Sequence, residues 1–378
     1  MSSLTLDQRP AERRSGGLLR RLIHGAVGSS VYTSARAIYR LVDRRERQTP
    51  FPWRHKLASW SRGFRADTAA VYDFPRDDWR DYLSDYARIH RCADINPAPE
   101  IFDHKLLFRS FLLMKGFRQA ETVAVVSNGD FLLHPFADEP RYLGAAEFEE
   151  WLLRDGGSYV AKPQDGGRGT DIFLLEAADG RLVRRRGTKV TPFRADALAG
   201  VTLVERRIPQ AEFWRALCPE STNTIRALTM WTPGDPEPFI GTAVQRIGTS
   251  ATAPTDNWSG GGINAPIDLQ TGRLGLGRMH PLKGKSARTE FTHHPDTGAQ
   301  IIGVVLPYWD RVCDTVLRAA RTLPINRYVG WDVVVDESGT PLIIEANKNS
   351  DVNLLQVHGG LLANARVRRF YEAVGGLR

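Results

Sequence analysis

The stretch that most constrains the fold is residues 330–351, GWDVVVDESGTPLIIEANKNSD. Two β-branched runs flank the turn DESG, and this pattern predicts a β-hairpin. Because side chains alternate along a strand, Glu345 and Asn347 are expected on one face. If the two strands pair in register, Asp332 faces them from the neighbouring strand. These three side chains have two interpretations. Either they are solvated groups at strand ends, or they form a cluster of oxygens with no Lys or Arg beside Asp332 or Glu345.

A cluster of two carboxylates and an amide oxygen has a specific chemical meaning. Converging oxygens of this kind are costly unless a cation neutralises them, and they are the ligands that Mg²⁺ prefers. A phosphate often completes the shell of such an ion. The cluster therefore predicts a phosphate-binding segment elsewhere in the chain.

The segment YVAKPQDGGRGTDIFLLE, residues 159–176, fits that expectation. It predicts a strand carrying Lys162, a glycine-rich loop and a second strand. Glycines let backbone N–H groups approach an anion closely, and a lysine adds a point charge beside them. The alternative is a flexible hairpin with an exposed lysine.

Length and composition indicate a soluble globular protein. A chain of 378 residues suggests two or three packed subdomains. Cys92, Cys218 and Cys313 form no metal or disulfide pattern, which favours a reducing, cytoplasmic compartment. No apolar run reaches the ~18–20 residues of a membrane span, and the first residues lack the apolar core of a signal peptide.

The net charge of +8 is concentrated at the N-terminus. Residues 1–65 contain 14 Lys or Arg and 4 Asp or Glu, whereas the remainder contains 37 and 39. A basic arm of this kind either contacts an anionic membrane surface or acidic partner, or packs as a solvated helix. We favour the packed helix, because GAVGSS interrupts the helical pattern. No nucleic-acid partner is expected, since the basic residues lack interleaved stacking aromatics.

The periodicity of the rest predicts alternating helices and strands. Helices are expected at 76–94, 103–117, 144–157 and 306–324. Two strands are expected around the Asn-Gly turn within 122–135. Further strands are expected within 200–217, where an extended segment follows the strand, and within 221–231, 239–248 and 256–275.

The order of these segments resembles the ATP-grasp superfamily. STNTIRALT, DNWSGGG and the 330–351 hairpin are most similar to its sugar-transfer-associated branch, over about residues 100–365. The resemblance implies an α+β fold in which two α+β subdomains clasp ATP. Here a basic, mostly helical N-terminal extension replaces the compact α/β domain common in the family. The implied divisions are an arm at 1–48, a helical region at 49–143, a small subdomain at 144–215 and a large subdomain at 216–378.

The resemblance also implies where the nucleotide phosphates bind. Lys105 in DHK and Lys162 in VAKP match the two lysines that hold the phosphates. Gly166, Gly167 and Gly169 match the loop that closes over them.

The adenosine part of the nucleotide is assigned in the same way. Glu205 matches the acid at the end of the hinge strand, near the adenine amino group. Arg206 and Ile208 would line the adenine slot with backbone polar groups. Glu212 is a less certain match for the ribose-binding acid.

The metal and the reaction are assigned to the large subdomain. Asp332, Glu345 and Asn347 match the ligands of Mg²⁺, for which Mn²⁺ can substitute. Arg226 and Arg246 are assigned to the acyl phosphate and its oxyanion, the alternative for each being an ion pair between strands.

These roles imply an ATP-dependent ligase that joins a small-molecule carboxylate to an amine through an acyl phosphate, in a glycan or specialised-metabolite pathway. Two alternatives stay open. One is a phosphotransferase with the same nucleotide residues, and the other is a non-enzymatic nucleotide-binding protein. His293 and His294, in FTHHPDTG, are expected to be loop residues and not catalytic bases.

Overall fold

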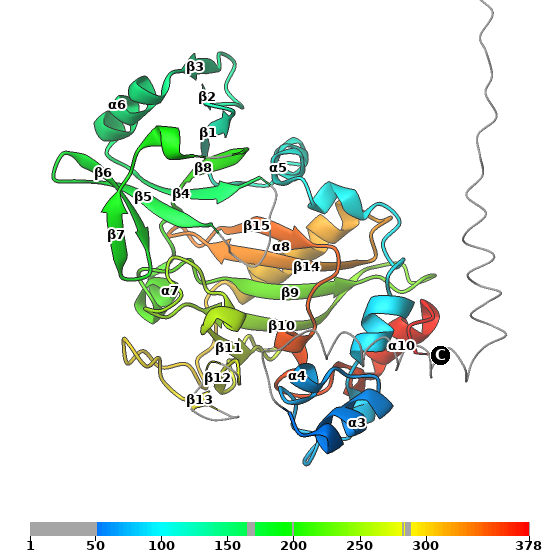
Figure 1. Ribbon diagram of the computed structural model, residues 1–378. Coiled ribbons are helices and arrows are strands. Elements are labelled where there is room, and N and C mark those ends of the chain that lie inside the picture. Colours follow the sequence, from blue (N-terminus) through cyan, green and yellow to red (C-terminus); the bar gives the residue numbers. More distant parts are fainter. Residues whose placement is uncertain (1–50, 165–170, 199, 282, 284–288, 378) are drawn as a thin grey trace, which may run out of the picture. The chain divides into compact units, whose positions relative to one another are not determined.

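The computed structural model describes residues 51–164, 171–198, 200–281, 283 and 289–377 (Figure 1). The chain divides into two compact units, Met1–Ala69 and Ala70–Arg378, and each is described by itself. In the first unit, α3 (Trp53–Ser61) begins after Pro52 and is followed by α4 (Ala66–Ala69). The predicted arm at 1–48 lies outside the described residues. None of the described helices combines the length and apolarity that a membrane span requires.

The first sheet of the second unit has eight antiparallel strands in the order β3-β2-β1-β8-β4-β5-β6-β7 (Figure 1). The strands are β1 (Thr122–Ser127), β2 (Asp130–Leu133), β3 (Arg141–Leu143), β4 (Ser158–Pro163), β5 (Phe173–Ala178), β6 (Arg181–Arg186), β7 (Lys189–Pro192) and β8 (Thr202–Arg206). Helix α6 (Ala145–Asp155) buries Phe148 and Leu152 in the core of this sheet.

Two local predictions for this sheet are confirmed. Asn128 and Gly129 have φ angles of 53° and 88°, as a tight Asn-Gly hairpin turn requires. Helix α6 ends at Gly156, whose φ of 65° is left-handed. The sheet extends to both sides of the division predicted at residue 143, because β1 pairs with β8 across about 80 residues of chain. Such a long-range pairing leaves no mark in the local pattern.

The second sheet has seven antiparallel strands in the order β13-β12-β11-β10-β9-β14-β15. The strands are β9 (Ile225–Met230), β10 (Phe239–Ile247), β11 (Ile263–Pro266), β12 (Gly277–Met279), β13 (Glu290–Phe291), β14 (Tyr328–Val335) and β15 (Pro341–Asn347). Helix α8 (Trp309–Thr322) covers one face, where its Val312 and Val316 join the largest apolar core (Figure 1). The opposite face carries the polar side chains of the site.

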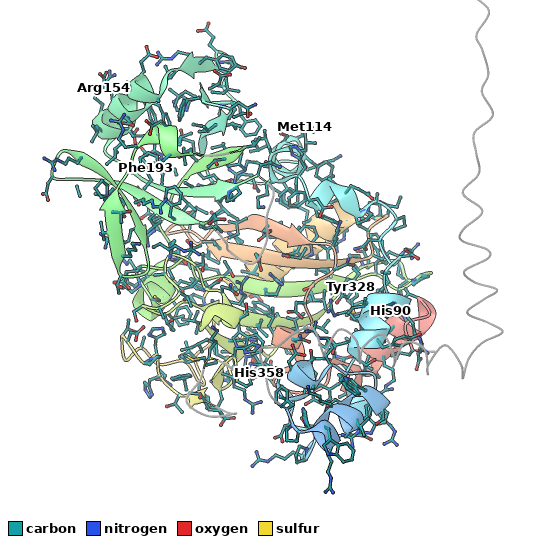
Figure 2. The ribbon with its side chains drawn as sticks, in the orientation of Figure 1. His90, Met114, Arg154, Phe193, Tyr328 and His358 are labelled. Atoms are coloured by element: carbon teal, nitrogen blue, oxygen red, sulfur yellow. The ribbon has the colours of Figure 1, made fainter. Side chains whose placement is uncertain are left out.

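Helix α5 (Lys105–Met114) connects the two sheets. Phe108 and Leu112 lie in the core of the second sheet, whereas the backbone N–H of Leu106 donates to the side chain of Gln164 beside the first sheet, at 3.1 Å. The exposed Met114 marks its outer side (Figure 2). The helix ends before Gly116, as the sequence predicts.

The helix predicted at 76–94 is wrong. The structure has a 3₁₀ turn at Trp79–Asp81 and a short π-helical turn at Ala87–Arg91. Between them, the backbone N–H and C=O of Leu83 both pair with the side-chain amide of the buried Gln356, each at 3.0 Å. A continuous helix would need these two backbone groups for its own hydrogen bonds.

One of the remaining helices follows β8, and the others lie near the C-terminus. Glu212–Leu217 forms α7, where the sequence predicts an extended segment. The others are α9 (Asn353–Gln356) and α10 (Ala365–Ala373). Short 3₁₀ turns occur at Pro99–Phe102, Ala195–Ala197, Trp258–Gly260 and Leu361–Ala363.

Candidate active site

The β14–β15 hairpin has the register that the sequence predicts. Asp332 pairs with Glu345, and Gly330 pairs with Asn347, so the three polar side chains share one face. The turn is held by Asp336, whose Oδ1 accepts hydrogen bonds from the backbone N–H groups of Ser338 and Thr340, both at 2.9 Å.

The expectation that no Lys or Arg lies beside Asp332 is wrong. Nε and Nη2 of Arg226 donate to the two carboxylate oxygens of Asp332, at 2.5 and 2.8 Å. Nη1 of Arg246 donates to the second oxygen at 3.2 Å. Asp332 and Arg226 are 2% and 6% exposed, so this is a buried ion pair. The partners come from β9 and β10, about 100 residues away in sequence, which is why the hairpin alone does not predict them.

The two arginines keep Asp332 ionised. Burial raises the pKa of Asp332, but Arg226 and Arg246 outweigh this effect and the pKa is lowered. Burial in turn lowers the pKa of Arg226, and the nearby carboxylates, Asp332 above all, reverse this. Asp256 pairs with Arg246 at 2.6 Å, yet burial dominates there and raises its pKa.

A glycine makes the close packing of this cluster possible. A Cβ built on Gly330 would lie 2.5 Å from Oγ of Ser350 and 3.4 Å from Cδ of Arg226. Nη1 of Arg226 donates to that Ser350 hydroxyl at 3.4 Å. A side chain at position 330 would therefore displace Ser350, and with it the segment that follows β15.

Some oxygens on this face remain free to accept a cation. A carboxylate offers about four lone-pair sites, and the two guanidinium groups fill three on Asp332. Glu345 is half-buried opposite, and Asn347 donates through its nitrogen to the carbonyl of Gly330, which leaves its oxygen as an acceptor. No three His, Cys, Asp or Glu side chains converge in the described ranges, so an ion here would need the Asn347 oxygen and ligand oxygens. The metal assignment stays a prediction.

A pocket brings together residues that the sequence places far apart. Its lining joins α5, the two sheets and the chain around them. The residues are Phe102, Lys105, Phe108, Arg109, Gln119, Lys162, Glu205, Ile344, Glu345 and Ala346. Four of the predicted site residues, Lys105, Lys162, Glu205 and Glu345, therefore share one cavity.

Glu205 is held in this pocket by two cations. Lys162 lies 2.8 Å from one carboxylate oxygen and Arg109 lies 2.6 Å from the other. Burial raises the pKa of Glu205, but Lys162 and Arg109 outweigh it, so the pKa is lowered. The sequence interpretation missed Arg109. Its signal is its place one helical turn after Lys105, since residues four apart share a helix face.

The other predicted nucleotide residues lie apart from this lining. Arg206 follows Glu205 on β8, and its side chain pairs with Glu121 at 2.7 Å and Asp155 at 2.9 Å. Its backbone N–H donates to the Glu121 carbonyl. Ile208 is half-buried after β8, and the exposed Glu212 pairs with a neighbour on α7.

Two further predictions concern loops. Gly166, Gly167 and Gly169 lie outside the described residues. His294 is buried, and its ring is 2.7 Å from the Gly248 carbonyl, whereas His293 is exposed. These two histidines are loop residues, as expected.

The family model for sugar-transfer associated ATP-grasp proteins matches residues 90–371, and the chain belongs to this family. It accordingly has the α+β ATP-grasp fold. No curated protein matches the sequence.

Three solved synthetase and ligase structures are similar at low sequence identity. D-alanine–D-alanine ligase from Bacillus anthracis is 13% identical over 74% of this chain and 68% of its own, with a TM-score of 0.38. N5-carboxyaminoimidazole ribonucleotide synthetase from Thermotoga maritima is 12% identical over 66% and 42%, with a TM-score of 0.34. L-amino acid ligase from Bacillus licheniformis is 12% identical over 66% and 41%, with a TM-score of 0.32. The chain thus spans less than half the length of the last two.

Proposed function

We propose that this protein is a Mg-ATP-dependent ligase that joins a carboxylate to an amine through an acyl phosphate. The observation that carries the proposal is the pocket that places Lys105, Lys162 and Glu205 in the same lining as Glu345. The two lysines that would bind a triphosphate and the carboxylate that would bind a metal therefore line one pocket.

The lysines would bind the nucleotide. Lys162 shares Glu205 with Arg109, so its ammonium can turn to a phosphate while Arg109 still neutralises the acid. Lys105 donates to the Gln164 carbonyl at 3.2 Å, which places its ammonium at the end of β4. Asp332, Glu345 and Asn347 would hold Mg²⁺, and the ion would supply positive charge that offsets the charge developing on the phosphates.

The arginines would act on the reacting groups. In this reaction a carboxylate oxygen attacks the γ-phosphorus, ADP leaves, and an acyl phosphate forms. An amine then attacks the acyl carbon and inorganic phosphate leaves. Arg226 and Arg246 are held rigidly by Asp332, and such preorganised donors stabilise developing negative charge most effectively.

The test is ADP release in a screen of carboxylate and amine pairs, with hydroxylamine as a trap. A ligase gives a hydroxamate, because hydroxylamine captures the acyl phosphate. ADP release without hydroxamate, together with a phosphorylated hydroxyl product, would establish the phosphotransferase instead. Binding of Mg-ATP with no turnover of any pair would favour the non-enzymatic alternative.

A further inference from the structure

The loop motif DNWSGGG, residues 256–262, begins with an acid that has no role in the proposed reaction so far. Asp256 is 4% exposed and lies in the chain that follows β10. Its Oδ1 is 2.6 Å from Nη2 of Arg246, one of the two arginines that would act on the reacting groups. A buried carboxylate at this distance limits the positions that the guanidinium can take.

Asp256 is itself held by Thr224, which belongs to the motif STNTIRALT. Oδ2 of Asp256 accepts hydrogen bonds from the backbone N–H of Thr224 at 2.8 Å and from its hydroxyl at 2.5 Å. The backbone carbonyl of Thr224 accepts from the backbone N–H of Arg246 at 2.8 Å. Thr224 therefore contacts both members of the ion pair and limits how far they can move relative to each other.

A glycine allows the loop to bring Asp256 into this position. A Cβ built on Gly262, the last residue of the motif, would lie 2.7 Å from the backbone oxygen of Asp256 and 3.1 Å from that of Asn257. The backbone N–H of Gly262 donates to the same Asn257 carbonyl at 3.0 Å. A larger residue at position 262 would therefore displace the backbone of Asp256, and Arg246 would lose its partner.

Arg246 uses fewer of its donors than Arg226 does. Every side-chain nitrogen of Arg226 has a partner, Asp332 for Nε and Nη2 and Ser350 for Nη1. In Arg246, Nη1 donates to Asp332 at 3.2 Å and Nη2 pairs with Asp256, whereas the buried Nε has no hydrogen-bond partner among the residues described. A guanidinium carries five N–H donors, so Arg246 keeps donors for a ligand. Its side chain is 14% exposed, against 8% for Arg226.

We propose that Asp256 is a positioning residue which, together with Thr224, holds the Arg246 guanidinium where it binds the transferred phosphoryl group. The inference rests on the proposed function, because that reaction supplies the phosphoryl group. Asp332 and Asp256 fix the two terminal nitrogens of Arg246, so the guanidinium is oriented before a ligand arrives. Donors that are oriented in advance stabilise developing negative charge without reorganising during the reaction.

Phosphate binding by the full chain, in the presence of Mg-ADP, tests the proposal without a known substrate. The probe is inorganic phosphate, and a ³¹P NMR titration measures its Kd. Arg246→Met should weaken phosphate binding about 10- to 100-fold, because a charged donor is lost. Asp256→Asn should weaken it about 3- to 10-fold, since a neutral amide holds the guanidinium less firmly than a carboxylate does. Unchanged binding in Asp256→Asn, or no phosphate binding by the unaltered chain, would overturn the proposal.

Thr224 and Asp296 provide matched variants. Thr224→Val removes the hydroxyl that holds Asp256 and should give a smaller loss in the same direction, whereas Thr224→Ser keeps both donors and should bind phosphate normally. Oδ2 of Asp296 accepts from the backbone N–H of Ser250 at 2.8 Å, in the same connection between β10 and β11, so Asp296→Asn is the control and should keep its affinity. An equal loss in Asp296→Asn would assign the effect to the loop and overturn the positioning role. If Asp256→Asn does not fold, Thr224→Val carries the test.

Kinetics separate this inference from the proposed function. For any carboxylate and amine pair found by ADP release, Asp256→Asn should lower kcat about 10- to 100-fold, because the donor is misplaced. The KM for ATP and the Mg-ATP thermal shift should stay unchanged, since the lysines would hold the nucleotide. If phosphate binding depends on Asp256 but no pair is turned over, the ligase proposal fails and the positioning role stands. If a pair is turned over and Asp256→Asn leaves kcat unchanged, the positioning role fails and the ligase proposal stands.

Discussion

Two buried acids, one in each sheet, are neutralised in different ways. Glu205 on β8 is 5% exposed and is shared between Lys162 and Arg109. Asp332 on β14 is 2% exposed and is held at both oxygens by the fork of Arg226, with Arg246 on one of them. In both cases the cations lower the pKa against the effect of burial.

The difference lies in how easily the cations can be transferred to a ligand. A lysine is a point charge on a flexible stem, whereas an arginine fork is planar and fixed by two parallel hydrogen bonds. Lys162 can therefore leave Glu205 and bind a phosphate, while Arg109 continues to neutralise Glu205. Arg226 is locked to Asp332. The first sheet is suited to binding and release, and the second to a permanent charge arrangement.

The largest effect is expected at Glu345, on the face of the second sheet where we propose that Mg²⁺ binds. Glu345→Ala should abolish Mg²⁺-dependent ATP turnover, because the cation loses a principal carboxylate. The fold should persist, since Glu345 is only half-buried. Glu337→Ala, at an exposed position on the same hairpin, is the matched control and should keep its activity. ADP release measures both, and normal turnover in Glu345→Ala would remove the metal assignment.

The next largest effect concerns the ion pair between Arg226 and Asp332. Arg226→Met should lower the free energy of unfolding by about 3–5 kcal/mol, because Asp332 is left buried with one weaker partner. The double variant Arg226→Met/Asp332→Leu should recover most of that loss, since a buried pair can be replaced by apolar groups. Urea unfolding measures both. If the single variant is as stable as the unaltered chain, the ion pair of Arg226 and Asp332 does not stabilise the second sheet as described.

The hairpin shows how far sequence reasoning reaches here. The register of Asp332 and Glu345 follows from a local turn and alternating strands, so the sequence predicts it. The arginines on Asp332 come from β9 and β10, and only the sheet pairing brings them there.

Substitution of Lys162, in the first sheet, should give a smaller effect that appears only when Mg-ATP is bound. Lys162→Met should lose most of the stabilisation by Mg-ATP, which for the unaltered chain is about 2.7 kcal/mol at a nucleotide concentration 100-fold above Kd. Lys115→Met, at an exposed position after α5, should keep it. Differential scanning fluorimetry measures the shift. If Lys162→Met retains the shift, Lys162 does not bind the phosphates and the contrast between the sheets disappears.

Acid should weaken both ion clusters. The folded pKa values of Glu205 and Asp332 lie below the unfolded values of 4.5 and 3.8. The stability that these two carboxylates contribute to the folded state is therefore complete above pH 4.5. It is lost as the pH falls through their pKa values in the folded state. Asp256, whose pKa is raised, acts in the opposite sense. Glu205→Gln should flatten the acid limb of the stability profile measured by urea unfolding. An unchanged limb would show that Glu205 is not held as described.

The smallest effect is expected from the N-terminal arm, residues 1–48. Every residue assigned to the nucleotide lies from Lys105 onward, so deleting residues 1–48 should leave the Mg-ATP thermal shift unchanged. A folded truncated chain that no longer binds nucleotide would make the arm part of the site. The arm carries ten Arg against four Asp or Glu, so an anionic surface is its alternative partner. Flotation with anionic vesicles tests this separately, and an electrostatic contact should be lost at high salt and in the truncated chain.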